Sequence, residues 1–309
     1  MASNTTCNTC SDPTCSAKTR QHDESVEDFA RRQRLQGNLC RIKHKFFVLS
    51  GKGGVGKSTV AANLALTLGM NGFRAGLLDI DLHGPSVPTL LGLTRAQART
   101  TREGLIQPVA LTSQVSVMSI AFLLQGEDEA VIWRGPMKAG VIEQLLADVD
   151  WGPLDALIVD CPPGTGDEPL SIVQKVGDAD GAVIVTTPQQ VATADVRRSI
   201  SFCHKLDLPV LGVIENMAGF VCPHCQKTTD IFRTGGGEAM AADMGVPYLG
   251  RIPIDPELVN AGDQGVPYVQ KFAERPAAKA FVHAVEPLIG MLERDRVPAA
   301  GPASGTVQE

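Results

Sequence analysis

The sequence predicts an α/β domain in which helices cover both faces of a doubly wound, mostly parallel sheet. The first observation is a series of short apolar runs that are continuous rather than alternating, which is typical of strands buried on both faces. The second is that longer segments of helical character separate these runs, so that strand and helix alternate. The third is a glycine-rich stretch, "SGKGGVGKST" at residues 50–59, which follows the first run directly.

The predicted elements follow one another in a regular order along the chain. The apolar runs that we interpret as strands lie at 46–50, 75–81, 115–120, 156–160, 181–187 and 209–216. The segments that we interpret as helices lie at 57–70, 137–149, 191–206 and 273–294. No internal repeat is visible. The alternation therefore predicts one folded domain, residues 41–294.

Both ends of the chain differ from this domain. Residues 1–40 form a polar, cysteine-containing N-terminal tail without apolar periodicity at its start. Within it, "ESVEDFARRQRLQG" at 24–37 predicts one exposed helix. Residues 295–309 are rich in Pro, Gly and Ala, a composition typical of disorder. We therefore expect two loose tails around the domain.

Composition and charge exclude several classes of protein. The chain has 309 residues, of which 43% are hydrophobic and 20% charged, as in globular proteins. Its net charge of −6 predicts no broad basic surface, so we expect neither a nucleic-acid nor a membrane partner. No apolar run approaches the roughly 20 residues of a membrane span, and the N-terminus lacks a signal pattern. We expect a cytoplasmic protein, in which cysteines are free thiols or metal ligands rather than disulfides.

The glycine-rich stretch fits the phosphate-binding pattern G-x-x-x-x-G-K-[ST] in full, between a predicted strand and a predicted helix. Glycines let backbone N–H groups curl around phosphate oxygens, and the helix N-terminus adds a favourable dipole. Lys57 is expected to reach the β- and γ-phosphates of ATP, and the Ser58 hydroxyl to bind Mg²⁺. The predicted nucleotide-binding residues of this loop are Gly51, Lys52, Gly53, Gly54, Val55, Gly56, Lys57, Ser58 and Thr59.

Acidic residues end two other predicted strands. Asp160 ends "ALIVD", and Asp79 and Asp81 end "GLLDID". Ligands gather at the carboxyl ends of strands in open α/β sheets, so these carboxylates are expected near the phosphate loop. Helix caps and turns also use Asp. Because a phosphate site needs carboxylates to hold Mg²⁺ and place water, we favour a functional role.

Several motifs together resemble a known family. "KGGVGKST" looks like the deviant Walker A motif of the MinD/ParA/nitrogenase-iron-protein class of P-loop ATPases. "DIDLHGPSVP", "DCPPGTGDE" and "IENMAGFVCPHC" look like one branch of that class, the Mrp/ApbC family of iron–sulfur cluster carrier ATPases. The resemblance spans about residues 41–290. It implies a P-loop NTPase fold of the deviant Walker A type.

The resemblance also implies roles for single residues. Lys52, the second lysine of the loop, would be the signature lysine that crosses a dimer interface to the phosphates bound by the other subunit. A cation supplied in this way stabilises charge on the γ-phosphoryl oxygens. Asp81 would lie in switch I near the attacking water, and Asp160 would begin switch II. Asn216 matches the position that hydrogen-bonds the adenine. The implied catalytic residues are Lys52, Lys57 and Asp81.

Cys222 and Cys225 form a C-x-x-C pair that can grip one metal ion or two corners of a cluster. A closed site needs four ligands, and no further cysteine follows Cys225. A two-fold dimer supplies four thiolates from two pairs. The resemblance implies this arrangement with a bridging [4Fe–4S] cluster, although Zn²⁺ satisfies the same ligand count. A thioredoxin-like redox pair is disfavoured because the motif follows a strand rather than opening a helix.

Three further cysteines crowd the polar N-terminal tail. They are candidate ligands of a second cluster, with Cys40 as a distant fourth. Some relatives carry a four-cysteine cluster motif there, and its spacing differs from the C-x2-C-x4-C of this chain, which leaves the second cluster open. Cys161 and Cys203 are expected to be packed in the core. The three tail cysteines are Cys7, Cys10 and Cys15.

These observations favour an ATP-hydrolysing homodimer that carries an iron–sulfur cluster to apo-proteins and works with assembly factors. A positioning ATPase that binds membrane or DNA is the first alternative. It would need a basic amphipathic C-terminal helix or a basic face, and the C-terminal "AAGPASGTVQE" contains no basic residue. An ATP-driven reductase resembling the nitrogenase iron protein is the second alternative. It would need a dedicated electron acceptor, for which no sequence feature provides evidence.

Overall fold

A computed structural model of the chain describes residues 16–82, 84–124, 135–222, 224–225 and 227–296. Within these residues, one sheet of nine strands forms the centre of the molecule, in the order β10-β9-β8-β1-β7-β2-β6-β5, with β11 also paired to β9. The strands are β1 (Ile42–Ser50), β2 (Ala75–Asp79), β5 (Val109–Ala110), β6 (Val115–Ser119), β7 (Leu154–Asp160), β8 (Gly181–Thr186), β9 (Val210–Val221), β10 (Thr228–Thr229) and β11 (Tyr248–Ile254). A separate two-stranded ribbon joins β3 (Arg99–Thr100) to β4 (Ile106–Gln107).

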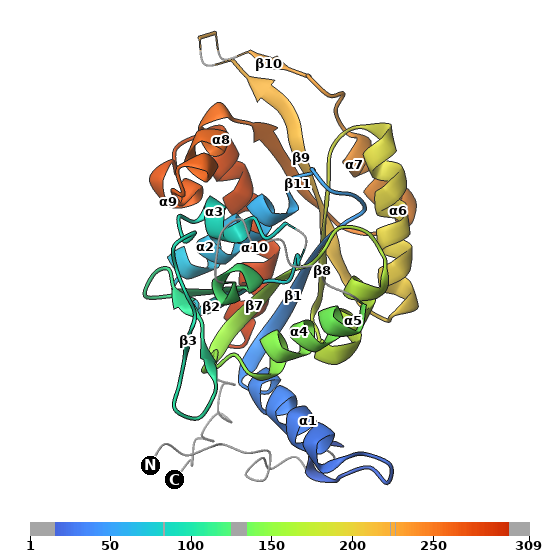
Figure 1. Cartoon of the computed structure of the whole chain (residues 1–309). Helices are drawn as coiled ribbons and strands as arrows, with labels where there is room; N and C mark the ends of the chain where they lie inside the picture. The colour runs from blue at the N-terminus through green and yellow to red at the C-terminus, as the bar shows by residue number, and fades with distance from the viewer. Residues whose placement is uncertain (1–15, 83, 125–134, 223, 226, 297–309) are drawn as a thin grey trace, which may run out of the picture.

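The sheet is parallel except for two short strands. β1 pairs in parallel with β7 and β8, while β10 and β5 run antiparallel to β9 and β6. Helices cover both faces (Figure 1). α2 (Lys57–Met70) and α10 (Pro276–Arg294) lie together on one face, and α5 (Asp167–Val176) and α6 (Gln190–Lys205) on the other. The predicted doubly wound α/β fold is confirmed.

Burial of the strands explains why they read as continuous apolar runs. Every residue of β2, β7 and β8 is buried, and Phe46 and Phe47 of β1 are fully enclosed. Side chains alternate between the two faces of a strand, so burial of consecutive residues requires a helical layer on each face. The other described α-helices that build these layers are α3 (Val87–Leu90), α4 (Gly135–Ala147), α7 (Gly236–Met244), α8 (Pro256–Asp263) and α9 (Tyr268–Lys271).

The helix expected in the N-terminal tail is α1 (Val26–Leu39). Its first turn is capped by the Ser25 hydroxyl, which accepts a hydrogen bond of 3.0 Å from the Asp28 amide. Contrary to the expectation of an exposed helix, its second half packs on α4. Leu39 is buried, and the Asn38 side-chain amide donates to the Val149 carbonyl oxygen at 3.1 Å.

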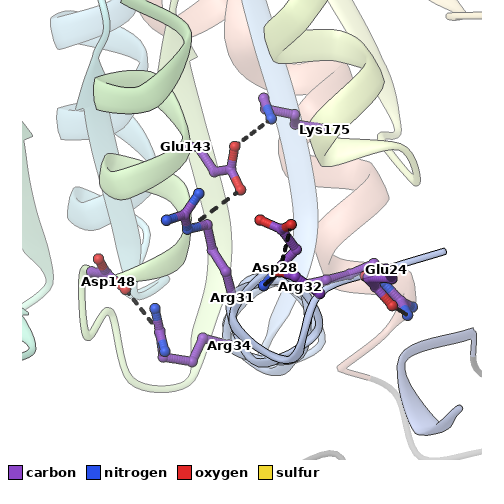
Figure 2. Close-up of polar contacts among 9 residues, drawn as sticks. Glu24, Asp28, Arg31, Arg32, Arg34, Glu143, Asp148 and Lys175 are labelled. Carbon is purple, nitrogen blue, oxygen red and sulfur yellow. Dashed lines mark hydrogen bonds and ion pairs between the residues drawn. The ribbon is translucent and has the colours of Figure 1, made fainter. Parts of the chain in front are cut away.

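Ion pairs extend this contact between α1 and the domain (Figure 2). Arg34 pairs with Asp148 at 3.1 Å, and Glu143 of α4 lies between Arg31 of α1 and Lys175 of α5. The N-terminal helix is therefore fixed to the helical layer that α4 and α5 form. At the other end of the chain, Arg296 lies 3.8 Å over the Phe73 ring, and residues 297–309 of the expected C-terminal tail lie outside the described residues.

Within the described residues, no helix combines the length and the apolar character needed to cross a membrane.

Candidate nucleotide and cysteine sites

The glycine-rich loop joins β1, at the centre of the sheet, to α2. Gly54 and Gly56 both adopt left-handed backbone conformations, with φ of 77° and 80°, that favour glycine. Gly51 lies so close to α6 that a Cβ there would meet the backbone of Asp195 at 2.5 Å. The loop therefore depends on glycine for its own turns and for its packing. A cavity of about 280 Å³ opens over it, lined by Ser50, Lys52, Gly53, Gly54, Gly56, Lys57, Ser58, Thr59, Asp81, Gly84, Ser86, Leu90 and Pro163.

Lys57 and Asp160 form a buried ion pair at the base of this cavity. The Lys57 side chain is 6% exposed and that of Asp160 is fully buried. Burial raises the pKa of Asp160, and the Lys57 ammonium opposes this shift. The Lys57 ammonium also lies 3.4 Å from the Ser58 hydroxyl. Lys57, which is expected at the phosphates, and Asp160, which is expected at Mg²⁺, are thus in contact. This agrees with the sequence, because the carboxyl ends of neighbouring parallel strands lie at the same edge of the sheet.

The donor set at this point suits Mg²⁺. The Asp160 Oδ2 atom is buried and has no hydrogen-bond partner among the described residues, so one carboxylate oxygen remains available. A hydroxyl oxygen, that of Ser58, lies beside the same ion pair. Carboxylate and hydroxyl oxygens are the ligands that Mg²⁺ takes in nucleotide sites, usually with waters and phosphate oxygens completing the octahedron. The residues present therefore fit the ion.

Asp79 is a second buried carboxyl beside Asp160. The two residues are register neighbours on β2 and β7, and neither side chain is exposed. Burial, followed by the negative charge of Asp160, raises the pKa of Asp79 to about 8. Its Oδ2 accepts a hydrogen bond from the Ser119 hydroxyl at 3.0 Å, and its Oδ1 accepts from the Asp81 amide at 3.1 Å. Asp79 therefore holds a proton to higher pH than an exposed carboxyl does, and its hydrogen bond to the Asp81 amide shapes the turn that carries Asp81.

Asp81 lines the cavity over the glycine-rich loop and also a neighbouring cavity of about 600 Å³. The second cavity lies between the turn after β2 and the loop that leads into α5, where Pro162, Asp167 and Glu168 line it. The Asp81 Oδ1 atom accepts a hydrogen bond of 3.3 Å from the Gly84 amide. Asp81 therefore lies where the two loops predicted as switches face the phosphate loop.

Lys52 differs from Lys57 in every contact. Its side chain is only partly buried, and its backbone carbonyl accepts a hydrogen bond of 3.0 Å from the Ser50 hydroxyl. Its ammonium makes no hydrogen bond or ion pair with any residue that the structure describes. The same loop thus holds one lysine fixed by a buried carboxylate and a second one without a partner in its own chain's described part.

Asn216 lies on β9 and reaches the phosphate loop. Its side-chain amide donates a hydrogen bond of 2.9 Å to the Val55 carbonyl oxygen, and the residue is 4% exposed. A Cβ at Gly56 would lie 2.2 Å from the Asn216 Nδ2 atom. The predicted hydrogen bond from Asn216 to the adenine stays a prediction. The structure adds a contact that the sequence did not indicate, between β9 and the backbone of the phosphate loop.

Cys222 and Cys225 lie just past β9, in a hairpin that projects beyond the body of the sheet (Figure 1). We call residues 218–234 the cysteine loop. Cys222 is partly buried and Cys225 exposed, and the Cys222 amide donates to the Lys227 carbonyl oxygen at 3.0 Å. Hydrogen bonds from the Cys225 and His224 amides lower the pKa of the Cys222 thiol, which favours the thiolate that binds metals.

The described residues of one chain do not complete a metal site at Cys222 and Cys225. Among the described residues, no group of three or more Cys, His, Asp or Glu side chains is placed to hold a metal ion. His224 is exposed. A closed tetrahedral site needs four ligands, so the pair supplies half of one.

The other described cysteines lie away from the cysteine loop. Cys161 and Cys203 are buried, as expected, and burial raises the pKa of both thiols, that of Cys203 to about 12. Cys40 caps α1, at the opposite end of the molecule from the cysteine loop (Figure 1). The candidate second-cluster ligands Cys7, Cys10 and Cys15 lie outside the described residues.

Sequence reasoning missed Glu215, the residue before Asn216. Its carboxylate is fully buried and accepts hydrogen bonds from the amides of Gly235, at 3.2 Å, and Gly237. A charged residue within the apolar run "PVLGVIEN" was the available signal, because a buried carboxylate needs partners.

Comparison with known proteins places the chain in a family. Residues 41–289 match the family described as "ParA: NUBPL iron-transfer P-loop NTPase". A cytosolic Fe-S cluster assembly factor NUBP2 homolog from Monosiga brevicollis is 49% identical over 260 residues, which cover 84% of this chain and 92% of that protein. An iron-sulfur cluster carrier protein from Methanocaldococcus jannaschii is 46% identical over 260 residues, covering 84% and 89%.

A solved structure agrees with these relatives. The nucleotide-binding protein from Archaeoglobus fulgidus, in complex with ADP, superimposes with a TM-score of 0.70 at 37% identity, covering 80% of this chain and 95% of that one. Both the family match and these relatives span nearly all of the domain that carries the phosphate loop and the cysteine pair. This chain therefore belongs to the NUBPL/Mrp family of iron–sulfur cluster carrier P-loop NTPases, the family that its motifs resemble.

Proposed function

We propose that this protein is an ATP-hydrolysing homodimer that binds one iron–sulfur cluster between its two subunits and transfers it to apo-proteins. The observation that carries the proposal is the position of Cys222 and Cys225. They lie on a hairpin that projects from the sheet, and each described chain offers two thiols where a cluster needs four ligands. A two-fold axis through the hairpins would bring both pairs together.

The same symmetry gives the unpaired lysine a role. In the proposed closed dimer, the Lys52 ammonium reaches the phosphates bound by the other subunit, where it stabilises charge on the γ-phosphoryl oxygens. Lys57 holds the phosphates within its own chain, and its present partner Asp160 becomes available when the ammonium turns toward them. Asp81, at the junction of both cavities, orients the attacking water.

Ser58 and Asp160 would hold Mg²⁺ in this site. The ion, when bound, neutralises charge on the β- and γ-phosphate oxygens. Asn216 fixes the backbone of the phosphate loop at Val55, so that the backbone N–H groups of the loop stay oriented toward the phosphates. Each proposed role is thus filled by a residue that lines or braces the cavity over the loop.

The cargo is proposed to be a [4Fe–4S] cluster, and the recipients apo iron–sulfur proteins, with assembly factors as further partners. The names of two relatives, a cytosolic assembly factor and a carrier protein, support this assignment and the cytosol as compartment. We retain the division into residues 1–40, 41–294 and 295–309 as a proposal. The N-terminal tail cysteines remain a proposed second cluster site, independent of the bridging one.

The test is anaerobic reconstitution followed by iron, sulfide and zinc analysis of wild type, Cys222→Ala and Cys40→Ala. Cys40→Ala is the matched control for the bridging site, because Cys40 is also an exposed thiol but caps α1, far from the cysteine loop. Iron lost from this variant without loss of the bridging cluster would belong to the candidate N-terminal cluster. We expect about four bridging irons per dimer for wild type and the control, and their loss in Cys222→Ala. Transfer to an apo-[4Fe–4S] protein should follow the same pattern. Unchanged iron in Cys222→Ala, or half an equivalent of zinc per chain without iron, would contradict the proposal.

A further inference from the structure

Two adjacent residues of the strand β9 contact the two sites. Asn216 contacts the phosphate loop, and Glu215 contacts the residues at which the cysteine loop returns to the domain. Successive side chains of a strand point to opposite faces, so Glu215 and Asn216 serve different sides of the sheet. Asn216 donates to the Val55 carbonyl oxygen, and its amide fills the space that a side chain at Gly56 would need. Six residues after Asn216, the same strand delivers Cys222.

Glu215 closes the base of the cysteine loop. The cysteine loop begins after Met217, in the last part of β9, and ends before Gly235, the N-cap residue of α7. The buried Glu215 carboxylate accepts hydrogen bonds from the Gly235 and Gly237 amides, at the positive end of the α7 dipole. A Cβ at Gly237 would lie 2.9 Å from the Glu215 Oε2 atom, so the glycine permits this close contact. One carboxylate of β9 thus fixes the point at which the cysteine loop returns to the domain.

Met217 lies between these contacts and the loop in a strained conformation. Its φ is 58°, a left-handed value that is strained for a residue other than glycine. Pairing with β8 ends at Glu215, and the register with β11 shifts between Ile252 and Ile254. The Met217 side chain also reaches the phosphate loop, since its Cε lies 3.8 Å from a Cβ built at Gly56. The strand therefore changes direction at a residue whose side chain lies near Gly56 of the phosphate loop.

We propose that Glu215, Asn216 and Met217 are positioning residues that couple the nucleotide state of the phosphate loop to the placement of Cys222 and Cys225. A shift of the Val55 backbone moves Asn216, and the adjacent Met217 and Glu215 pass the shift to the two ends of the cysteine loop. This inference rests on the proposed function, since it assigns the route by which hydrolysis acts on the cargo. Coupling between two sites is reciprocal, so a bound cluster must change nucleotide affinity by the same factor as nucleotide changes cluster affinity.

Hydrogen–deuterium exchange of the cluster-free protein tests the route without cargo. Exchange of peptides covering the cysteine loop is measured with and without Mg²⁺ and ATPγS, for wild type, Glu215→Gln and Glu238→Gln. Glu238 is the matched control, because it lies in the first turn of the same helix but its carboxylate pairs with Arg251 on the surface. We expect ATPγS to change loop exchange at least threefold in wild type and in the control. In Glu215→Gln, the loop should exchange faster and the nucleotide effect should disappear.

A second pair of variants protects the test against loss of the fold in Glu215→Gln. Met217→Gly keeps a backbone that accepts positive φ and removes the side chain at the phosphate loop. Asp207→Gly makes the same kind of change at another left-handed residue, with φ of 52°, in the turn between α6 and β9. We expect Met217→Gly to reduce the nucleotide effect on loop exchange by half or more, and Asp207→Gly to leave it unchanged.

Two outcomes would overturn the inference. One is a wild-type nucleotide effect in both Glu215→Gln and Met217→Gly. The other is a wild-type protein that binds ATPγS, measured by calorimetry, without any change in the cysteine loop. Neither outcome depends on whether a cluster binds. Wild-type protein that shows the nucleotide effect but takes up no iron would instead contradict the proposed function and leave the coupling intact.

Discussion

Substitution of the two lysines of the phosphate loop by alanine should have different effects on stability, although both substitutions should reduce ATP hydrolysis. Lys57 is buried against the fully buried Asp160, and removing one partner of such a pair leaves an uncompensated charge. We expect Lys57→Ala to lower the free energy of unfolding by about 3–5 kcal/mol at pH 8 in nucleotide-free protein. The loss should shrink at pH 5.5, because the Asp160 carboxyl can then take up a proton. ATP hydrolysis should fall to background.

Lys52→Ala should leave stability nearly unchanged, within about 0.5 kcal/mol, because the ammonium has no partner among the described residues. ATP affinity should stay within about threefold of wild type, whereas turnover should fall on the order of 10²-fold or more, as for a cation that acts only in the transition state. Urea unfolding, calorimetric ATP binding and steady-state phosphate release measure the three quantities. Normal turnover in Lys52→Ala would refute the role of this lysine across the dimer, and wild-type stability of Lys57→Ala would refute the buried pair.

Three further predictions concern carboxyls and the N-terminal tail. Because the pKa of Asp79 is raised from 3.8 to about 8 in the fold, its contribution to stability is full below about pH 4 and is lost as the pH rises toward 8. In EDTA, Asp79→Asn should therefore gain stability relative to wild type from pH 5.5 to 7.5, and parallel urea midpoints would contradict this. Asp255 caps α8, and its carboxylate accepts hydrogen bonds from Arg275 and Tyr268. Burial of the carboxyl acts to raise its pKa, but these hydrogen bonds outweigh burial, so the pKa of Asp255 is lowered. Asp255→Asn should cost about 2–4 kcal/mol at pH 7, with the difference narrowing as the pH falls below about 4, whereas a constant difference would refute the ion pair. Deleting residues 1–15, which spares the buried Ala17, should leave ATPase activity and the bridging cluster intact; lower total iron per dimer would show that the deleted cysteines bind a second cluster.

Much of the fold could be predicted because its central strands are buried on both faces and consist of apolar residues. β11 escaped prediction, since "YLGRIPI" contains glycine, arginine and proline and is only partly buried at the edge of the sheet. The packing of α1 was also missed. Its Arg31 and Arg34 are typical of a solvent-exposed helix face, and only the structure shows that Glu143 of α4 and Asp148, just after α4, lie opposite them.

The part of the nucleotide site that was predictable consists of the residues at the carboxyl ends of parallel strands. Lys57 and Asp160 meet because the carboxyl ends of β1 and β7 are neighbours in a parallel sheet. The raised pKa of Asp79 was not predictable, because it depends on the burial of this carboxyl and on the register that sets it beside Asp160. The contacts of Glu215 depend on the return of a loop about 20 residues later in the chain, and no local pattern encodes that return.

Native mass spectrometry of mixed subunits tests the central claim, a cluster shared between two chains, most directly. Wild-type and mass-tagged Cys222→Ala chains are mixed, exchanged and reconstituted anaerobically with iron and sulfide. If the two subunits share the cluster, we expect one [4Fe–4S] cluster on wild-type dimers, little or none on heterodimers with three thiolates, and none on monomers. A stable full cluster on isolated monomers, or equal cluster occupancy of wild-type and mixed dimers, would contradict it.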